Sequence, residues 1–196
     1  MEIPILHLSF GQVLWALSYG EAPQRHLVDK VNYLRKLGIP FPKGRRAAGS
    51  GNRVHYSYYD LIECGVAFHA LMNGMKPKDI VKVLADDRAS MHPIYALALQ
   101  EQPDHCLTAD WVKSKGRIKA LQENEIFLRL HDRYAQNPNS AEVVPHASEG
   151  DQMLNIFQSL EHQGNQIVRN VPLTRLAMQW TYWALQAPEL RTGPKE

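Results

Sequence analysis

Apolar residues recur at helical spacing near the start of the chain. Ser9 and Gln12 have the separation of a capping box, in which each side chain accepts a hydrogen bond from the other residue's backbone amide. The apolar residues that follow them are Val13, Leu14 and Leu17. The pattern predicts a helix that begins after Ser9 and ends near Gly20, since glycine suits a helix end.

A second helix is predicted over residues 23–37, because Pro23 suits a first turn and Gly38 a helix end. Rotation by about 100° per residue gives it one apolar face, which we expect in the core. That face consists of Leu27, Val31 and Leu34. The opposite side and the helix start carry Gln24, Arg25, His26, Asp29, Asn32 and Lys36. Such side chains are long enough to meet base edges in a major groove, although an ordinary solvated face has the same pattern.

Residues 43–53 are rich in glycine and basic side chains and too poor in apolar residues to pack in a core. The β-prone residues 54–56 follow, so residues 43–56 are predicted to form a basic wing. The basic side chains of the predicted wing are Lys43, Arg45, Arg46 and Arg53. From residue 25 to residue 53, eight Lys and Arg face one Asp, a balance of +7 that suits a polyanion. A solvated basic surface without a partner is the alternative.

Two more helices are predicted before residue 88. Ser57 and Asp60 have the capping-box spacing, and the helix that they open is expected to end at Asn73-Gly74. Pro77 suits the first turn of the next helix, whose apolar positions are Ile80, Val83 and Leu84. The region before residue 88 is therefore expected to be built from four short helices and a wing.

The order helix, turn, helix, basic wing, helix resembles the DNA-binding domain of the MerR family of bacterial transcription regulators. The most specific part runs from "R-x-x-Y-S-x-x-D-L", residues 53–61, to "L-M-N-G-M-K-P-K-D-I-V-K-V-L", residues 71–84. The resemblance covers residues 5–87. It implies a winged helix-turn-helix fold and promoter binding as a dimer, with helix 23–37 in the major groove and the wing on the phosphate backbone.

We expect single residues to have different roles in such a complex. Arg25, Asp29 and Asn32 are expected to face bases, and the residues expected to face phosphates are Lys43, Arg45, Arg46, Arg53 and Tyr56. The family usually separates the wing Arg and Tyr by one residue, whereas two residues separate Arg53 from Tyr56. Either Arg53 or His55 therefore takes the phosphate-facing position.

The sequence predicts a mainly α protein in which the winged helix-turn-helix, residues 1–88, precedes a helical or α+β domain for dimerisation or effector binding, residues 108–196. Residues 89–107 are expected to connect them as a linker or helix, and Pro93 and Pro103 interrupt any continuous coiled coil there. The expected later elements are a helix from Thr108, a strand (or a helix) over 125–134, a loop over 137–150, a short helix around 152–160, an extended segment over 166–171 and a final helix over 172–186.

The final helix is apolar on two sides. One side holds Trp180 and Trp183, and the other holds Met178, Tyr182 and Leu185. A helix of this kind is covered on both sides, and a second subunit could supply one cover. A central helix of a monomeric core and an aromatic effector pocket lined by Trp180, Tyr182 and Trp183 are the other two interpretations.

Catalytic and metal-binding patterns are weak. His146, Glu149 and Asp151 share a predicted loop, but their spacing matches no metal-ligand motif. The two cysteines, Cys64 and Cys106, form no Cys-x-x-Cys pair, which favours a reducing, cytoplasmic location. No apolar run approaches the ~18 residues of a membrane span. We therefore expect no enzyme activity, metal, cofactor or membrane partner.

The leading hypothesis is a dimeric, sequence-specific regulator that binds double-stranded DNA, with RNA polymerase as a candidate second partner. An architectural or excisionase-like protein that bends DNA with the same domain is the first alternative. An enzyme or a protein-interaction adaptor is the other alternative.

Overall fold

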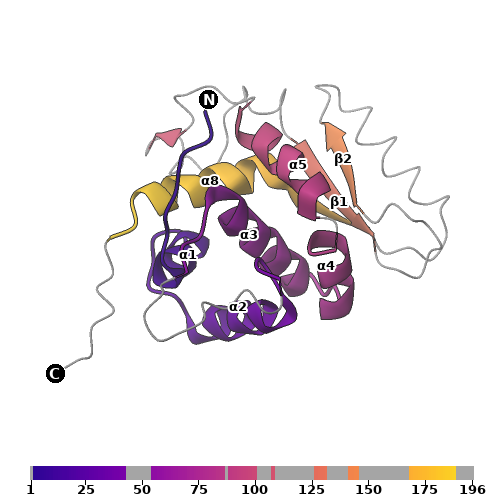
Figure 1. Cartoon of the computed structure of the whole chain (residues 1–196), viewed down its shortest axis with the longest axis horizontal. Helices are drawn as coiled ribbons and strands as arrows, with labels where there is room; N and C mark the ends of the chain where they lie inside the picture. The colour runs from indigo at the N-terminus through magenta and orange to yellow at the C-terminus, as the bar shows by residue number, and fades with distance from the viewer. Residues whose placement is uncertain are drawn as a thin grey trace.

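The computed structural model describes residues 2–42, 54–86, 88–100, 107–108, 126–131, 141–145 and 168–188 (Figure 1). In these residues the protein is mainly α, as predicted, with one small sheet. The helices are α1 (Phe10–Leu17), α2 (Arg25–Leu37), α3 (Tyr58–Met72), α4 (Pro77–Leu84), α5 (Arg88–Gln100) and α8 (Leu173–Leu185). The strands are β1 (Ile126–His131), β2 (Ala141–Pro145) and β3 (Val168–Pro172).

Helix α1 begins, as predicted, at a capping box. The Ser9 hydroxyl accepts a hydrogen bond from the Gln12 amide at 3.3 Å, and the Gln12 side chain accepts one from the Ser9 amide at 2.8 Å. The helix ends at Leu17, and Tyr19 and Gly20 take positive φ angles of 55° and 78° in the turn toward α2. A positive φ is unfavourable for a residue with a Cβ atom, so contacts with neighbouring elements have to hold this turn.

Helix α2 begins at Arg25, two residues later than the predicted start at Pro23, because Gln24 has an extended backbone and forms the N-cap. It ends as predicted at Gly38, whose φ of 107° lies in the left-handed region that favours glycine. The predicted apolar face is buried and consists of Leu27, Val31 and Leu34. In Figure 1, α2 runs along the lower edge of the molecule, with α3 above it.

Helix α3 is the central helix of the core. Its predicted capping box is present: the Ser57 hydroxyl accepts a hydrogen bond from the Asp60 amide, and the Asp60 carboxylate accepts one from the Ser57 amide at 2.8 Å. Buried residues lie on every side of α3, which contacts α2, α4, α5 and α8. These buried residues are Tyr58, Leu61, Ile62, Glu63, Cys64, Gly65, Val66, Ala67 and Ala70.

Helix α4 begins at Pro77 as predicted, whereas the expected interruption at Pro93 is wrong. Pro93 lies inside α5, in the region assigned to a linker or helical connection. Proline has no backbone N–H, so the Ala89 carbonyl loses its helical hydrogen bond. Both Pro93 and Ala89 are exposed, and water can therefore satisfy that carbonyl. The other side of α5 is buried through Met91, Tyr95, Ala98 and Leu99.

The sheet is antiparallel, in the order β2-β1-β3. Leu128 in the middle of β1 lies opposite Val143 of β2 and Val171 of β3. The predicted strand over 125–134 and the extended segment over 166–171 are confirmed as β1 and β3. The predicted loop over 137–150 is wrong for residues 141–145, because β2 pairs along β1 there. The helices predicted from Thr108 and around 152–160 lie outside the described residues, apart from Thr108 itself.

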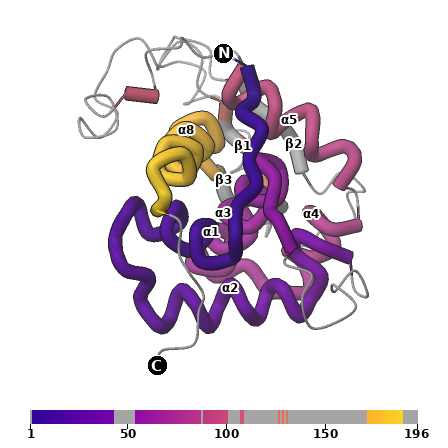
Figure 2. Tube along the Cα trace, turned by 60° about the vertical axis from the view of Figure 1, so that its left-hand side comes forward, coloured from indigo at the N-terminus to yellow at the C-terminus, as the bar shows by residue number. Residues whose placement is uncertain are grey.

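Helix α8 packs into the same core as the first half of the chain (Figure 2). It contacts α1, α3, α5 and β1, and the Ile126 amide of β1 donates a hydrogen bond to the Thr174 hydroxyl at 2.9 Å. The division of the chain at residue 88 stays a prediction, and these contacts place described residues from both sides of it in one core. None of the described helices is both long and apolar enough to span a membrane.

Candidate nucleic-acid interface

The outward side of α2 carries the side chains that were predicted to meet bases. The exposed residues are Gln24, Arg25, His26, Asp29 and Lys36, and Asn32 is half-buried. The side chains of Arg25 and Asp29 are 95% and 70% exposed. Because the core holds the opposite face of this helix, these groups are oriented away from the rest of the chain.

Polar side chains on the outward side of α2 contact each other along the helix. Arg25 Nε lies 3.8 Å from Asp29 Oδ2, and Arg35 Nη1 donates a hydrogen bond to Asn32 Oδ1 at 3.2 Å. Ion pairs in water contribute little stability, typically less than about 1 kcal/mol. The Arg25 guanidinium can therefore leave Asp29 for another acceptor at little cost.

Tyr33 belongs to the same exposed surface, although the sequence reasoning did not include it. Its side chain is 46% exposed, and it follows Arg25 and Asp29 at successive four-residue steps along α2. Residues four apart lie on one helix face, so this spacing was the signal that could have identified Tyr33. The outward side of α2 thus combines charged groups, amides and an exposed aromatic ring.

Residues on the two sides of the segment 43–53 meet beside α1. Leu8 and Tyr56 form an antiparallel bridge, with the Leu8 amide donating to the Tyr56 carbonyl at 3.0 Å and the Tyr56 amide donating to the Leu8 carbonyl at 2.8 Å. The Tyr56 ring lies 5.0 Å from the Phe41 ring and 6.1 Å from the Phe10 ring, measured between centroids. These aromatic contacts join residue 41, before the predicted wing, to residue 56, the last residue of that prediction.

The assignment of Tyr56 to the phosphate backbone is wrong, because its side chain is only 1% exposed. Burial also raises the pKa of its hydroxyl far above the ordinary value, with the nearby Arg35 guanidinium opposing the rise. Its ring contacts the Phe10 and Phe41 rings within the core. Tyr56 therefore belongs to the core.

Arg35 and His55 are basic groups beside this aromatic cluster. Arg35 Cζ lies 4.1 Å above the centroid of the Phe10 ring, a cation–π contact that leaves the charge at the surface. His55 is exposed, and its ring lies 6.2 Å from that of His7 in an edge-on arrangement. The four basic wing residues, Lys43, Arg45, Arg46 and Arg53, lie outside the described residues.

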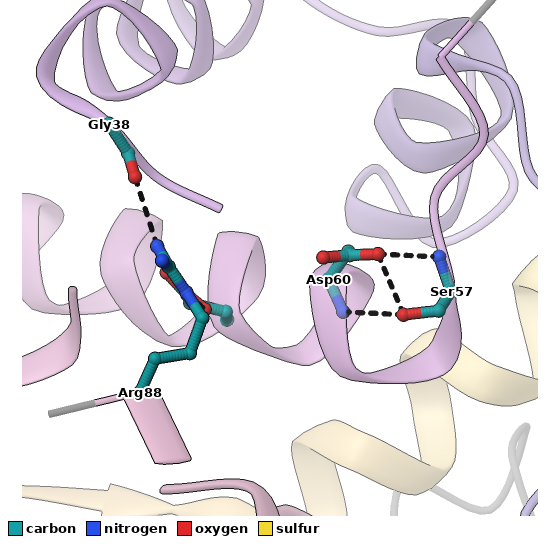
Figure 3. A network of polar contacts seen from close by, with 5 residues as sticks. Gly38, Ser57, Asp60 and Arg88 are labelled. Atoms are coloured by element: carbon teal, nitrogen blue, oxygen red, sulfur yellow. Dashed lines mark hydrogen bonds and ion pairs between the residues drawn. The ribbon is translucent and has the colours of Figure 1, made fainter. Parts of the chain in front are cut away.

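Arg88, the first residue of α5, pairs with the buried Glu63 of α3 and also reaches the end of α2 at Gly38 (Figure 3). Arg88 donates to both carboxylate oxygens of Glu63 at 2.7 Å, and its Nη2 also donates to the Gly38 carbonyl at 3.0 Å. The Glu63 side chain is 1% exposed and that of Arg88 is 19% exposed. Burial raises the pKa of Glu63 to about 7, although Arg88 opposes the shift.

The three aromatic residues predicted for a dimer or effector surface do not form an open site. Trp180 is 2% exposed, and Tyr182 and Trp183 are partly buried against the core. A Cβ atom on Gly65 would lie 2.4 Å from the Trp180 ring, and one on Gly20 would lie 2.3 Å from the Trp183 ring. Helices α1, α3 and α5 of the same chain thus cover α8, and its two apolar sides give no argument for a second subunit or a pocket.

The described residues contain no group of three or more His, Cys, Asp or Glu side chains that could hold a metal ion. Cys64 is buried in α3, and burial raises the pKa of its thiol well above the ordinary value. His146, Glu149, Asp151 and Cys106 lie outside the described residues.

No protein-family model matches the chain, and a search of the curated proteins found no match either.

Proposed function

We propose that this chain is a sequence-specific transcription regulator that binds double-stranded DNA, with α2 in the major groove and the wing on the phosphate backbone. The observation that carries this proposal is the two-sided character of α2. One face is anchored in the core, and the other presents Arg25, Asp29, Tyr33 and Lys36 to solvent. A helix that is fixed on one side and polar on the other fits a major groove, where side chains meet distinct base edges.

The neighbourhood of α2 supports a winged helix-turn-helix. Helix α1 precedes α2 after a short turn, and the Leu8–Tyr56 bridge brings the end of the predicted wing back beside the start of α1. The basic residues of the segment 43–53 lie, in sequence, between α2 and this bridge. This arrangement agrees with the MerR-like order of elements.

The positive charge of residues 25–53 favours a nucleic acid over a neutral partner. Eight basic side chains face one acidic side chain between residues 25 and 53, and lysine and arginine near phosphates gain affinity by releasing counterions. Phosphate contacts alone would give binding without sequence preference, whereas the polar face of α2 can supply base contacts.

A homodimer and a contact with RNA polymerase follow from the MerR resemblance, and both stay predictions. The apolar sides of α8 are covered within the chain and give them no support.

Selection from a pool of fragmented bacterial genomic DNA tests the function. The full-length chain should retain a small set of fragments, and footprinting should give one protected sequence near promoters. Broad coating, or footprints confined to recombination attachment sites, would favour an architectural protein. Absence of any retention at low salt would contradict DNA binding.

A further inference from the structure

Residues from the C-terminal half of the chain hold the turn that leads into α2. The Trp183 ring lies directly against Gly20, since a Cβ atom there would be 2.3 Å from the ring. The indole N–H of Trp180, one turn earlier on α8, donates a hydrogen bond to the Tyr19 hydroxyl. Tyr19 and Gly20 are the two residues of the turn with positive φ. Helix α8 therefore supports the least favourable backbone conformation next to the N-terminal end of α2.

Arg88, the first residue of α5, holds the other end of α2. Its guanidinium donates to the carbonyl of Gly38, the C-cap of α2, at 3.0 Å. The same guanidinium is fixed by both carboxylate oxygens of the buried Glu63. Because a planar guanidinium in a two-point contact has little freedom, the position of the C-cap depends on where α5 begins.

The two supports belong to one connected part of the fold. Helices α5 and α8 contact each other, and β3 continues into α8 at Pro172. The side chain of Thr174 in the first turn of α8 accepts a hydrogen bond from β1. A displacement of the sheet or of α5 would thus reach both ends of α2.

We propose that Trp183 and Arg88 are positioning residues that hold α2 from its two ends, so that α5 and α8 control sequence-specific DNA binding. This inference rests on the proposed function. Base contacts require an accurate helix orientation, whereas attraction to phosphates tolerates a displaced helix. Loss of either support is therefore expected to lower specific binding more than non-specific binding.

The test uses the full chain with Trp183→Ala and Arg88→Met, each beside a conservative variant, Trp183→Phe and Arg88→Lys. Leu185→Ala, an exposed apolar position of α8, and Lys82→Met, an exposed charge of α4, are the matched controls. Because Arg88→Met leaves Glu63 buried without its partner, Glu63→Gln/Arg88→Met removes both charges and separates a loss of folding from a loss of positioning. Each protein is measured for affinity to the selected site and to an unrelated duplex over a salt series, and for hydrogen exchange of the α2 amides.

We expect Trp183→Ala and the double variant to lower the ratio of specific to non-specific affinity by roughly tenfold, a coupling typical of sites linked through packing. The slope of log affinity against log salt should not change, and exchange of the α2 amides should become faster. Trp183→Phe should recover most of the loss, and the two controls should behave as wild type.

Unchanged ratios and unchanged exchange in these variants would overturn the proposal. Equal losses on both duplexes with a smaller salt slope would also overturn it, since Arg88 would then be a phosphate contact. If the wild-type chain retains no DNA at low salt, the proposed function fails separately, and with it the control of DNA binding. The exchange data then still decide whether the two residues hold α2.

Discussion

Arg88 of α5 and Glu63 of α3, which are 25 residues apart in sequence, form a two-point ion pair with both N–O distances at 2.7 Å. The carboxylate is almost fully buried, and the guanidinium also donates to the end of α2. Removing a charge from water is costly unless its partners replace the lost hydration. The pair therefore makes stability sensitive to the protonation of Glu63.

The unfolding free energy should depend on pH through the ionisation of Glu63. Burial raises the pKa of Glu63 from its ordinary value of 4.5 to about 7, so the folded state binds this proton more tightly than the unfolded state. The resulting stabilisation is complete below about pH 4.5 and is lost as the pH rises through 7. Relative to Glu63→Gln, the wild type should lose at most about 3 kcal/mol of unfolding free energy over this interval.

Urea denaturation of both proteins between pH 4.5 and 8 measures this difference. Glu21→Gln, which removes an exposed carboxyl group, is the matched control and should run parallel to the wild type. A wild type that gains stability over the variant as the pH rises would show that the attraction of Arg88 outweighs the cost of burial.

The contact between α3 and α8 predicts the effect of a single methyl group. Gly65→Ala would place a Cβ atom 2.4 Å from the Trp180 ring, and both residues are buried, so the ring or one of the helices would have to shift. Such overpacking typically costs about 1–3 kcal/mol, even though alanine by itself favours a helix by about 1 kcal/mol over glycine.

Chemical denaturation of Gly65→Ala, Trp180→Phe and the double variant forms a mutant cycle. The smaller phenylalanine ring should make room for the added methyl group, so the double variant should lose less stability than the sum of the single changes. Additive losses would contradict direct packing of Trp180 on Gly65.

Substitution of Arg25 should show whether this residue contacts a base or a phosphate in the proposed complex. Its pair with Asp29 is almost fully exposed and opens easily. If Arg25 contacts a base with two hydrogen bonds, Arg25→Ala should cost ~1–3 kcal/mol on the selected site and little on unrelated DNA. Titration of labelled duplexes measures both losses, with Lys82→Ala on α4 as the control. Equal losses on the two duplexes would assign Arg25 to a phosphate.

The predicted wing should control the salt dependence of binding. Each neutralised phosphate contributes about 0.9 to the slope of log affinity against log salt, so Arg45→Ala/Arg46→Ala should flatten that slope by up to ~2. Affinity for specific and unrelated DNA should fall about equally. The double variant Lys78→Ala/Lys82→Ala removes two exposed charges from α4 and should leave the slope unchanged. A wild-type slope in the arginine variant would place these two arginines outside the interface.

Local chemistry alone determined much of the helical framework. The capping boxes at Ser9 and Ser57 form because the second residue of each box lies three positions later in the chain. Gly38 ends α2 because glycine tolerates a positive φ. The buried face of α2 follows from a periodicity that any helix must have. The candidate site was predicted to the same extent, since exposure of Arg25, Asp29 and Lys36 follows from the opposite side of that periodicity.

Tertiary structure decided everything that depends on neighbours distant in sequence. The sequence predicted Tyr56 as a surface residue, but its contact with Phe41 and its bridge to Leu8 place it in the core. Pro93 is compatible with a helix because Pro93 and Ala89, the residue whose carbonyl it leaves without a helical donor, are both exposed. Helices α1, α3 and α5 of the same chain cover the two apolar sides of α8. The apolar pattern of α8 alone did not distinguish this cover from a second subunit. Hydrophobic periodicity identifies the side chains that are buried. Which element buries them depends on how the whole chain packs.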